Sequence, residues 1–408
     1  MGKLANLSPQ LRQYLLVTGN YWAFTLTDGA LRMLVVLHFH SLGYSPLSIA
    51  MLFLFYEIFG VITNLVGGWL GARIGLNKTM NIGLALQVIA LVMLLVPSSL
   101  LTVLWVMSAQ ALSGIAKDLN KMSAKSSIKL LVDNNQQGKL FKWVAILTGS
   151  KNALKGIGFF LGGALLAAFE FQGAISIMAT ALALVWLFSV FSLKKELGKA
   201  SNKPKFKHIF SKSRSVNVLS AARLFLFGAR DVWFVVALPV YLSSQFDWEP
   251  VTVGSFIAIW IIGYGVVQAI APAFTGKKSG RLPDGKTVFF WAATLTSLPA
   301  LIALSMTFEL PAELSLLGGL LIFGALFAIN SSLHSYLIVS YANEDGVSLD
   351  VGFYYMANAM GRLIGTVLSG WVYQTAGLEA CLWVSSLFLC IATFISLFLP
   401  QHKIKPYI

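Results

Sequence analysis

Cysteine is almost absent from this chain of 408 residues, which has only Cys381 and Cys390. Both fall in the last long apolar stretch, where their spacing along one helix is too great for a disulfide. No Cys-x-x-Cys pair and no Cys/His spacing typical of zinc sites occurs. The sequence therefore predicts neither a disulfide framework nor a metal site.

Charged residues are also scarce, at 11% of the chain against 57% hydrophobic residues. Soluble domains carry about a quarter charged residues, so this composition predicts an all-α polytopic membrane protein. Walker motifs, paired carboxylates and nucleophile elbows are lacking, so we expect no enzyme, no catalytic residues and no cofactor. The net charge of +14 comes without a nucleic-acid-binding motif, so we expect no nucleic-acid partner.

Long apolar stretches are what the chain has in abundance. A helix needs about 20 apolar residues to cross a bilayer, and we count twelve such spans. They lie near residues 15–39, 47–70, 79–97, 101–121, 142–168, 173–193, 217–242, 251–274, 287–308, 313–338, 350–373 and 378–400.

Basic side chains mark alternate loops between these spans. The richest loop, 194–214, contains Lys194, Lys195, Lys199, Lys203, Lys205, Lys207, Lys212 and Arg214. One other basic loop carries Lys125 and Lys129, and another carries Lys277, Lys278 and Arg281. Positive loops stay in the cytoplasm, so both termini are predicted to be cytoplasmic in a bacterial inner membrane. Loop 341–349 is the exception, because it is acidic and has no basic residue.

The basic loop divides the chain into two similar halves. We predict a six-helix bundle over 1–193, a cytoplasmic linker over 194–216 and a second six-helix bundle over 217–408. The repeat shows in matched residues: Asp28 with Asp231, Pro46 with Pro250, Asn64 with Gln268, and Lys155-x-x-Gly158-x-x-x-x-Gly163 with Arg362-x-x-Gly365-x-x-x-x-Gly370. Parallel six-helix repeats related by a pseudo-two-fold axis define one large transporter architecture.

Basic residues inside the spans outnumber acidic ones. The basic residues are Arg32, Lys117, Lys121, Lys151, Lys155, Arg223, Arg230 and Arg362, and the acidic ones are Asp28, Glu57, Asp118 and Asp231. A charge at the bilayer centre costs about 2.5–3.5 kcal/mol even on lenient scales, so such residues usually line a cavity or pathway. The surplus of positive charge predicts an anionic ligand.

Two motifs resemble those of the major facilitator superfamily. Residues 68–78 read GWLGARIGLNK, which is similar to its Gly-x-Leu-Ala-Asp-Arg-x-Gly-Arg-Lys signature, with Ala72 at the aspartate position. Residues 158–163 read GFFLGG, which is similar to its antiporter motif Gly-Pro-x-x-Gly-Gly, with Phe159 in place of proline. The resemblance implies two six-helix bundles and secondary transport.

Three further blocks resemble the ArsJ-type organoarsenical efflux permeases. They are SGIAKDLNKM at 113–122, TGSKNALKG at 148–156 and FGARDVW at 227–233. The resemblance implies efflux of 1-arseno-3-phosphoglycerate and arsenate resistance. Glyceraldehyde-3-phosphate dehydrogenase would be a metabolic partner that makes this ester, without physical contact. We expect the chain to act as a monomer.

That substrate has an oxyanion at each end, which several cations must pair. Lys151 and Lys155 project from one helix face, and Arg362 is the repeat partner of Lys155. With Arg230 they would form a two-sided clamp at the midplane. Residues near the clamp in sequence, which could hydrogen-bond substrate oxygens, are Asn152, Asn358 and Tyr354. Trivalent arsenic prefers thiolates, which are lacking here, whereas a pentavalent ester does not need them.

The other intramembrane charges have alternative interpretations. Asp28 and Arg32 have the spacing of an intrahelical ion pair; otherwise Arg32 is a fifth anion ligand. Lys117 either lines a vestibule or pairs with Asp118, and Lys121 is expected to reach the headgroups. Arg223 is either a cytoplasmic anchor or a vestibule residue.

The sequence is compatible with transport driven by protons or by the membrane potential. Asp28, Glu57, Asp118 and Asp231 are candidate proton sites, and the negative-inside potential could drive an anion outward without protons. Exchange of ordinary organophosphates, such as phosphoglycerates or sugar phosphates, is the alternative transport function. A receptor or enzyme on a transporter scaffold is the alternative from another class.

Overall fold

The computed structural model describes residues 8–43, 52–133, 136–193, 197–201, 204–206, 210–211, 213–275, 282–308 and 311–401. All regular structure in these ranges is helical, which confirms the all-α prediction. Several residues of the expected basic loops and of the repeat lie outside the described residues, namely Pro46, Lys194, Lys195, Lys203, Lys207, Lys212, Lys277, Lys278 and Arg281.

The helices of the first half follow the predicted spans. They are α2 (Pro9–Ser41), α4 (Leu54–Ile74), α5 (Leu76–Met93), α6 (Val103–Leu131) and α7 (Gln137–Ser192), with a short 3₁₀ turn η1 (Ser98–Leu100) before α6. The label α7 covers the fifth and sixth spans, which are two helices that meet at a kink at Glu170 (φ 57°). Gly75, with φ 100°, separates α4 from α5 in a conformation that suits glycine.

The second half repeats this plan. Its helices are α8 (Arg214–Phe234), α9 (Ala237–Gln245), α10 (Pro250–Phe274), α11 (Gly285–Thr307), α12 (Ala312–Tyr341) and α13 (Val347–Ser396). The last two spans are merged in α13, which is broken at Gly377 (φ 77°). The break follows Arg362 by fifteen residues, as the break at Glu170 follows Lys155, which agrees with the register of the sequence repeat.

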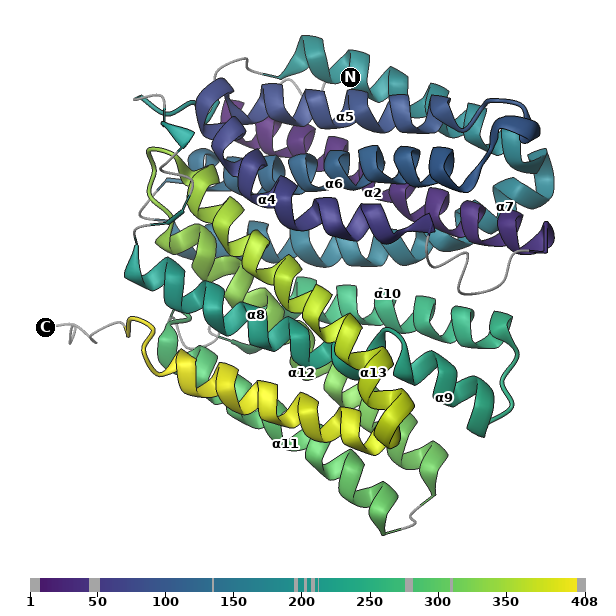
Figure 1. Ribbon diagram of the computed structural model, residues 1–408. Coiled ribbons are helices and arrows are strands. Elements are labelled where there is room, and N and C mark those ends of the chain that lie inside the picture. Colours follow the sequence, from purple (N-terminus) through teal and green to yellow (C-terminus); the bar gives the residue numbers. More distant parts are fainter. Residues whose placement is uncertain are drawn as a thin grey trace, which may run out of the picture. The chain divides into compact units, whose positions relative to one another are not determined.

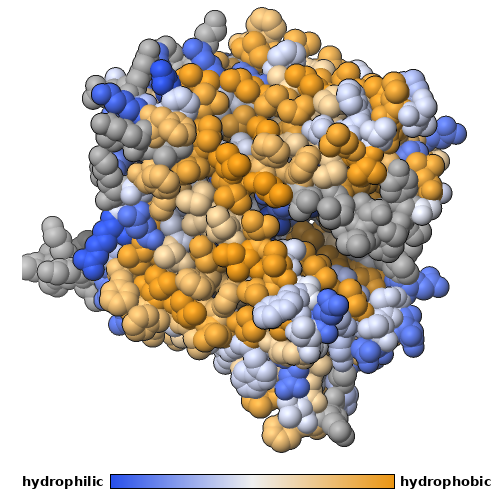
Figure 2. Space-filling model, viewed as in Figure 1, coloured by the Kyte–Doolittle hydropathy of each residue, from blue (hydrophilic) through white to orange (hydrophobic). Residues whose placement is uncertain are grey.

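Seven helical stretches in the described part of the chain are long and apolar enough to cross a membrane. They include the merged helices α7 and α13. The remaining predicted spans, near 15–39, 47–70 and 101–121, are the helices α2, α4 and α6, which carry Asp28, Arg32, Glu57, Lys117, Asp118 and Lys121. Figure 2 shows hydrophobic side chains over much of the visible helix faces, as expected for contact with lipid.

The chain divides into two compact units, shown as ribbons in Figure 1. Unit 1 comprises Met1–Trp143, Ser150–Ser211 and Ala342–Met356, and unit 2 comprises Val144–Gly149, Lys212–Tyr341 and Ala357–Ile408. In unit 1, α6 packs against α2, α4 and α5. In unit 2, α12 packs against α8, α10 and α11.

Aromatic side chains form much of the core of unit 2. The ring of Trp233 meets Phe323 edge to face at 5.1 Å, and Phe323 stacks on Phe327 at 5.6 Å. Phe227 on α8 contacts Phe327 at 5.1 Å. This packing holds α8 against α12 and fixes the helix face that carries the arginines described below.

Candidate anion-binding site

Asp231 on α8 is fully buried and lies between two arginines. Its Oδ1 accepts a hydrogen bond from Nε of Arg230 at 2.6 Å, and Nη2 of the same arginine is at 2.5 Å. Its Oδ2 accepts from Nε of Arg362, on α13, at 3.0 Å. The side chain of Arg362 remains 33% exposed. The Asp231 cluster (Arg230, Asp231 and Arg362) thus has two cations for one carboxylate.

Arg223 makes a second connection between α8 and α13. Its Nε donates to Oδ1 of Asn358 at 2.8 Å, and Nη1 lies 3.4 Å from the carbonyl oxygen of Ser331. The guanidinium stacks 3.8 Å from the Phe227 ring, and Arg230 contacts the same ring at 4.9 Å. Arg223 is therefore buried among side chains of unit 2.

The two charged residues of α2, Asp28 and Arg32, were expected to pair with each other, but each has a partner on α4. Arg32 forms its ion pair with Glu57 on α4, at 3.0 Å, in place of the expected pair with Asp28. Asp28 instead accepts hydrogen bonds from the Tyr56 hydroxyl at 2.9 and 3.1 Å. The Arg32 guanidinium also lies 4.1 Å from the centre of the Tyr56 ring. The partners, Glu57 and Tyr56, both lie on α4, so residue spacing within α2 does not reveal them.

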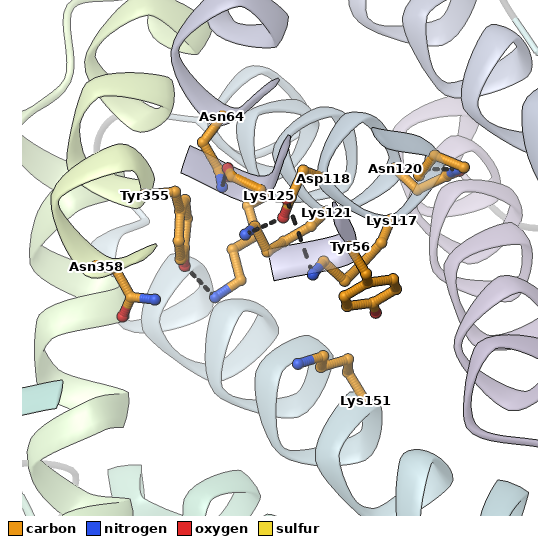
Figure 3. A network of polar contacts seen from close by, with 12 residues as sticks. Tyr56, Asn64, Lys117, Asp118, Asn120, Lys121, Lys125, Lys151, Tyr355 and Asn358 are labelled. Carbon is orange, nitrogen blue, oxygen red and sulfur yellow. Dashed lines mark hydrogen bonds and ion pairs between the residues drawn. The ribbon is translucent and has the colours of Figure 1, made fainter. Parts of the chain in front are cut away.

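Although the repeat pairs Asp231 with Asp28, Asp118 on α6 in unit 1 also lies beside two cations. Lys121 Nζ is 2.6 Å from its Oδ1, and Lys117 Nζ is 3.9 Å from its Oδ2. Lys117 thus lies beside Asp118, which is one of its two interpretations, and Lys121, which we expected to reach the headgroups, pairs with the same carboxylate. The Asp118 cluster (Lys117, Asp118 and Lys121) again has two cations for one carboxylate, as Figure 3 shows.

Lys125 was predicted to lie in a cytoplasmic loop, but α6 continues through it to Leu131. Its side chain is buried and Nζ donates to the Tyr355 hydroxyl. Sequence reasoning missed Lys125 and both tyrosines, Tyr56 and Tyr355. Lysines at 117, 121 and 125 recur every four residues, and this spacing could have revealed one basic face on α6.

Lys151 and Lys155 lie on α7 within unit 1, and both are half-buried. Nζ of Lys151 lies 3.3 Å from Oδ1 of Asn152, and Nζ of Lys155 lies 6.0 Å from the Phe159 ring. Arg230 and Arg362 belong to unit 2, so the clamp of these four cations stays a prediction. Tyr354 is buried and meets Tyr355 edge to face at 4.9 Å.

Among the described residues, no group of three or more His, Cys, Asp or Glu side chains is positioned to hold a metal ion. The cations of the two clusters are ammonium groups at Asp118 and guanidinium groups at Asp231. Arginine offers a planar fork to an oxyanion, and lysine offers a compact point charge.

The Major Facilitator Superfamily matches the chain over residues 15–263 and 219–407. No curated protein matches the sequence.

Solved structures of similar fold include the human organic anion transporter MFSD10, with 16% identity and a TM-score of 0.75, over 96% of this chain and 100% of that one. A bacterial homologue of the iron transporter ferroportin, in an outward-facing state, has 14% identity and a TM-score of 0.74, over 95% and 98%. The E. coli fucose:proton symporter FucP has 14% identity and a TM-score of 0.69, over 96% and 100%.

Proposed function

The chain belongs to the major facilitator superfamily of multi-pass membrane transporters, and from this premise we propose that it exports an organic oxyanion, 1-arseno-3-phosphoglycerate. The observation that carries the proposal is the repeated arrangement of one buried carboxylate with two cations. It occurs at Asp118 in unit 1 and at Asp231 in unit 2.

The charge balance favours an anion. Buried charges are expensive unless they are paired, and a carboxylate shared by two cations leaves each cluster with a positive charge. An oxyanion that enters such a cluster neutralises this charge and accepts hydrogen bonds from the same groups. A cationic drug or metal ion would add to the charge instead.

The number and chemistry of the cations favour a substrate with two anionic ends. Lys151 and Lys155 in unit 1 and Arg230 and Arg362 in unit 2 are the ligands we propose, with Arg32 as a fifth. Asn152, Asn358 and Tyr354 are the proposed hydrogen-bonding groups. The organic anion transporter among the similar structures shares only the fold with this chain, so the substrate class is argued from these charges.

The choice of the arsenic ester rests on the resemblance of three blocks to organoarsenical efflux permeases. A pentavalent arsenic ester needs no thiolate ligands, which agrees with a chain that has only two cysteines, of which Cys381 is buried. We place the protein in the bacterial inner membrane with both termini in the cytoplasm, where glyceraldehyde-3-phosphate dehydrogenase would supply the ester.

Uptake into everted membrane vesicles tests the proposal. Arsenate, glyceraldehyde 3-phosphate, NAD and the dehydrogenase are supplied together, then with each omitted, and vesicular arsenic is measured. We expect arsenic to accumulate only with the full set. Accumulation of phosphoglycerate without arsenic would instead identify the organophosphate exchanger.

Variants of the proposed ligands complete the experiment. Lys155→Gln and Arg362→Gln are expected to abolish uptake while the protein remains in the membrane at its normal amount. Lys142→Gln is the matched control, because Lys142 lies on the same helix as Lys155 but is exposed. Normal uptake by both test variants would disprove the assigned ligands.

A further inference from the structure

Three lysines form a row along α6 that the proposed clamp does not use. Lys117, Lys121 and Lys125, which we call the lysine ladder, follow one another every four residues. Successive ladder positions are therefore about 6 Å apart along one helix face. Lys125 is 3% exposed, and the side chains of Lys117 and Lys121 are 16% and 14% exposed.

Two tyrosines hold the ladder. Lys117 Nζ lies 3.8 Å from the centre of the Tyr56 ring. The Nζ atoms of Lys121 and Lys125 lie 4.6 and 4.8 Å from the centre of the Tyr355 ring, and Lys125 also donates to its hydroxyl. Aromatic faces attract cations without neutralising them, so these contacts orient the ammonium groups while leaving their charge.

The named side chains of this region include five basic ones and three acidic ones: Arg32, Lys117, Lys121, Lys125 and Lys151 against Asp28, Glu57 and Asp118. Glu57 is engaged by Arg32, Asp28 accepts from Tyr56, and Asp118 is shared by Lys117 and Lys121. In Figure 3 the amine of Lys151, from α7, faces the same region as the ladder. Bringing like charges together in a buried place is unfavourable unless an anion joins them.

We propose that the lysine ladder, with Tyr56 and Tyr355, is a subsite within unit 1 for a terminal phosphoryl or arsenoryl group. This inference rests on the proposed export of an organic oxyanion and adds to it where one end of the substrate binds. A tetrahedral oxyanion has several oxygens that accept in different directions, which suits ammonium groups arriving from successive helical turns. Tyr355 has a positioning role, because its hydroxyl holds Lys125.

Binding of inorganic phosphate to the purified full-length protein tests the subsite. The protein is placed in nanodiscs of phosphatidylcholine, and phosphate is titrated by calorimetry, with glycerate as the ligand that lacks a phosphoryl group. For Lys121→Gln we expect a dissociation constant about tenfold higher, because one charge-assisted hydrogen bond is lost. Tyr355→Phe keeps the ring and is expected to weaken binding by a smaller factor.

Lys139→Gln is the matched control. Lys139 also has a cation–π contact, 4.8 Å from the Trp143 ring, but it stands near the start of α7 outside the ladder. An unchanged dissociation constant in both ladder variants, or equal weakening in the control, would overturn the subsite. If phosphatidate in the disc abolishes phosphate binding to the normal protein, the ladder binds a lipid headgroup and the proposal is likewise wrong.

The vesicle experiment separates this proposal from the proposed function. A protein that exports the ester, but whose ladder variants bind phosphate normally, retains the function without the subsite. A protein that binds phosphate through the ladder, but does not transport the ester, retains the subsite and requires another organic phosphate as substrate.

Discussion

Asp118 in unit 1 and Asp231 in unit 2 are each shared by two cations. A buried pair contributes little net stability, but a buried charge that loses its partner is strongly destabilising. We therefore expect each aspartate to stabilise the two cations beside it when the transporter carries no substrate.

Replacing Asp231 by asparagine tests this role. Asp231→Asn leaves Arg230 and Arg362 without their carboxylate, and we expect the free energy of unfolding to fall by roughly 3 kcal/mol. This value is at the low end for a broken buried pair, because Arg362 is partly exposed. Thermal unfolding of the purified protein would show a lower melting temperature. Phosphate in the buffer should raise it more for the variant than for the normal protein, because an oxyanion replaces the lost charge.

Asp247→Asn is the control, because Asp247 is exposed and asparagine tolerates its positive φ of 52°. An unchanged melting temperature in Asp231→Asn, or an equal effect of phosphate on both proteins, would contradict the role of Asp231.

Individual residues also show how far sequence reasoning reaches. The surplus of cations is read directly from the sequence, and the contact of Lys117 with Asp118 was one of two interpretations because the two residues are neighbours in the chain. The partner of Arg32 could not be predicted, because Glu57 belongs to another helix and Asp28 lies closer to Arg32 in the sequence. Tyr56 and Tyr355 were missed because aromatic residues are common in membrane helices.

At the scale of helices, the paired glycines of the repeat divide into two kinds. A Cβ at Gly158 would lie 2.7 Å from the carbonyl oxygen of Leu26, and one at Gly365 would lie 2.6 Å from that of Gly228. These glycines allow α7 to approach α2, and α13 to approach α8, backbone to backbone. The second glycines, Gly163 and Gly370, have room for a side chain.

Alanine at these four positions should therefore have two different effects. Gly158→Ala and Gly365→Ala force neighbouring helices apart and are expected to destabilise the protein by about 1–3 kcal/mol, as other overpacked cores are. Gly163→Ala and Gly370→Ala should be neutral or slightly stabilising, because alanine is the better helix former. Melting temperatures of the four variants provide the measurement, and similar values in all four would contradict the assigned packing.

The fourth span shows why helix ends were harder to predict than helices. Lys125 and Lys129 suggested a loop after residue 121, yet α6 continues to Leu131. Tyr355 contacts Lys125, and Glu344 and Asp350 interact electrostatically with Lys129. The acidic loop 341–349, which departed from the charge rule, thus lies near a basic helix end within unit 1, while Asp345 accepts from the backbone of Ser201.

At the scale of the molecule, the all-helical fold followed from hydropathy, because spans of sufficient length have few alternatives in a bilayer. The register of the two halves also followed from sequence, and the breaks at Glu170 and Gly377 support it. The grouping of residues 342–356 with unit 1 and of 144–149 with unit 2 could not be predicted, because it depends on contacts between segments that are remote in the chain.

The charge of the proposed substrate predicts how export is driven. Each elementary charge that crosses the membrane contributes about 2.3 kcal/mol per 100 mV, so a negative-inside potential expels an anion. In everted vesicles, valinomycin with potassium should reduce arsenic uptake, and nigericin, which removes the pH gradient alone, should not. The opposite pattern would establish proton coupling and direct attention to Asp28, Glu57, Asp118 and Asp231.

The aspartates shared by two cations also set a threshold for what can enter. Any incoming ion must compete with a resident carboxylate that is already in place and hydrogen-bonded. Chloride, with one charge and no array of oxygens, gains too little to displace it, whereas an ester with an oxyanion at each end gains enough. A transporter built in this way would resist leaking the abundant small anions of the cell, and Asp231→Asn would be the variant in which such a leak first appears.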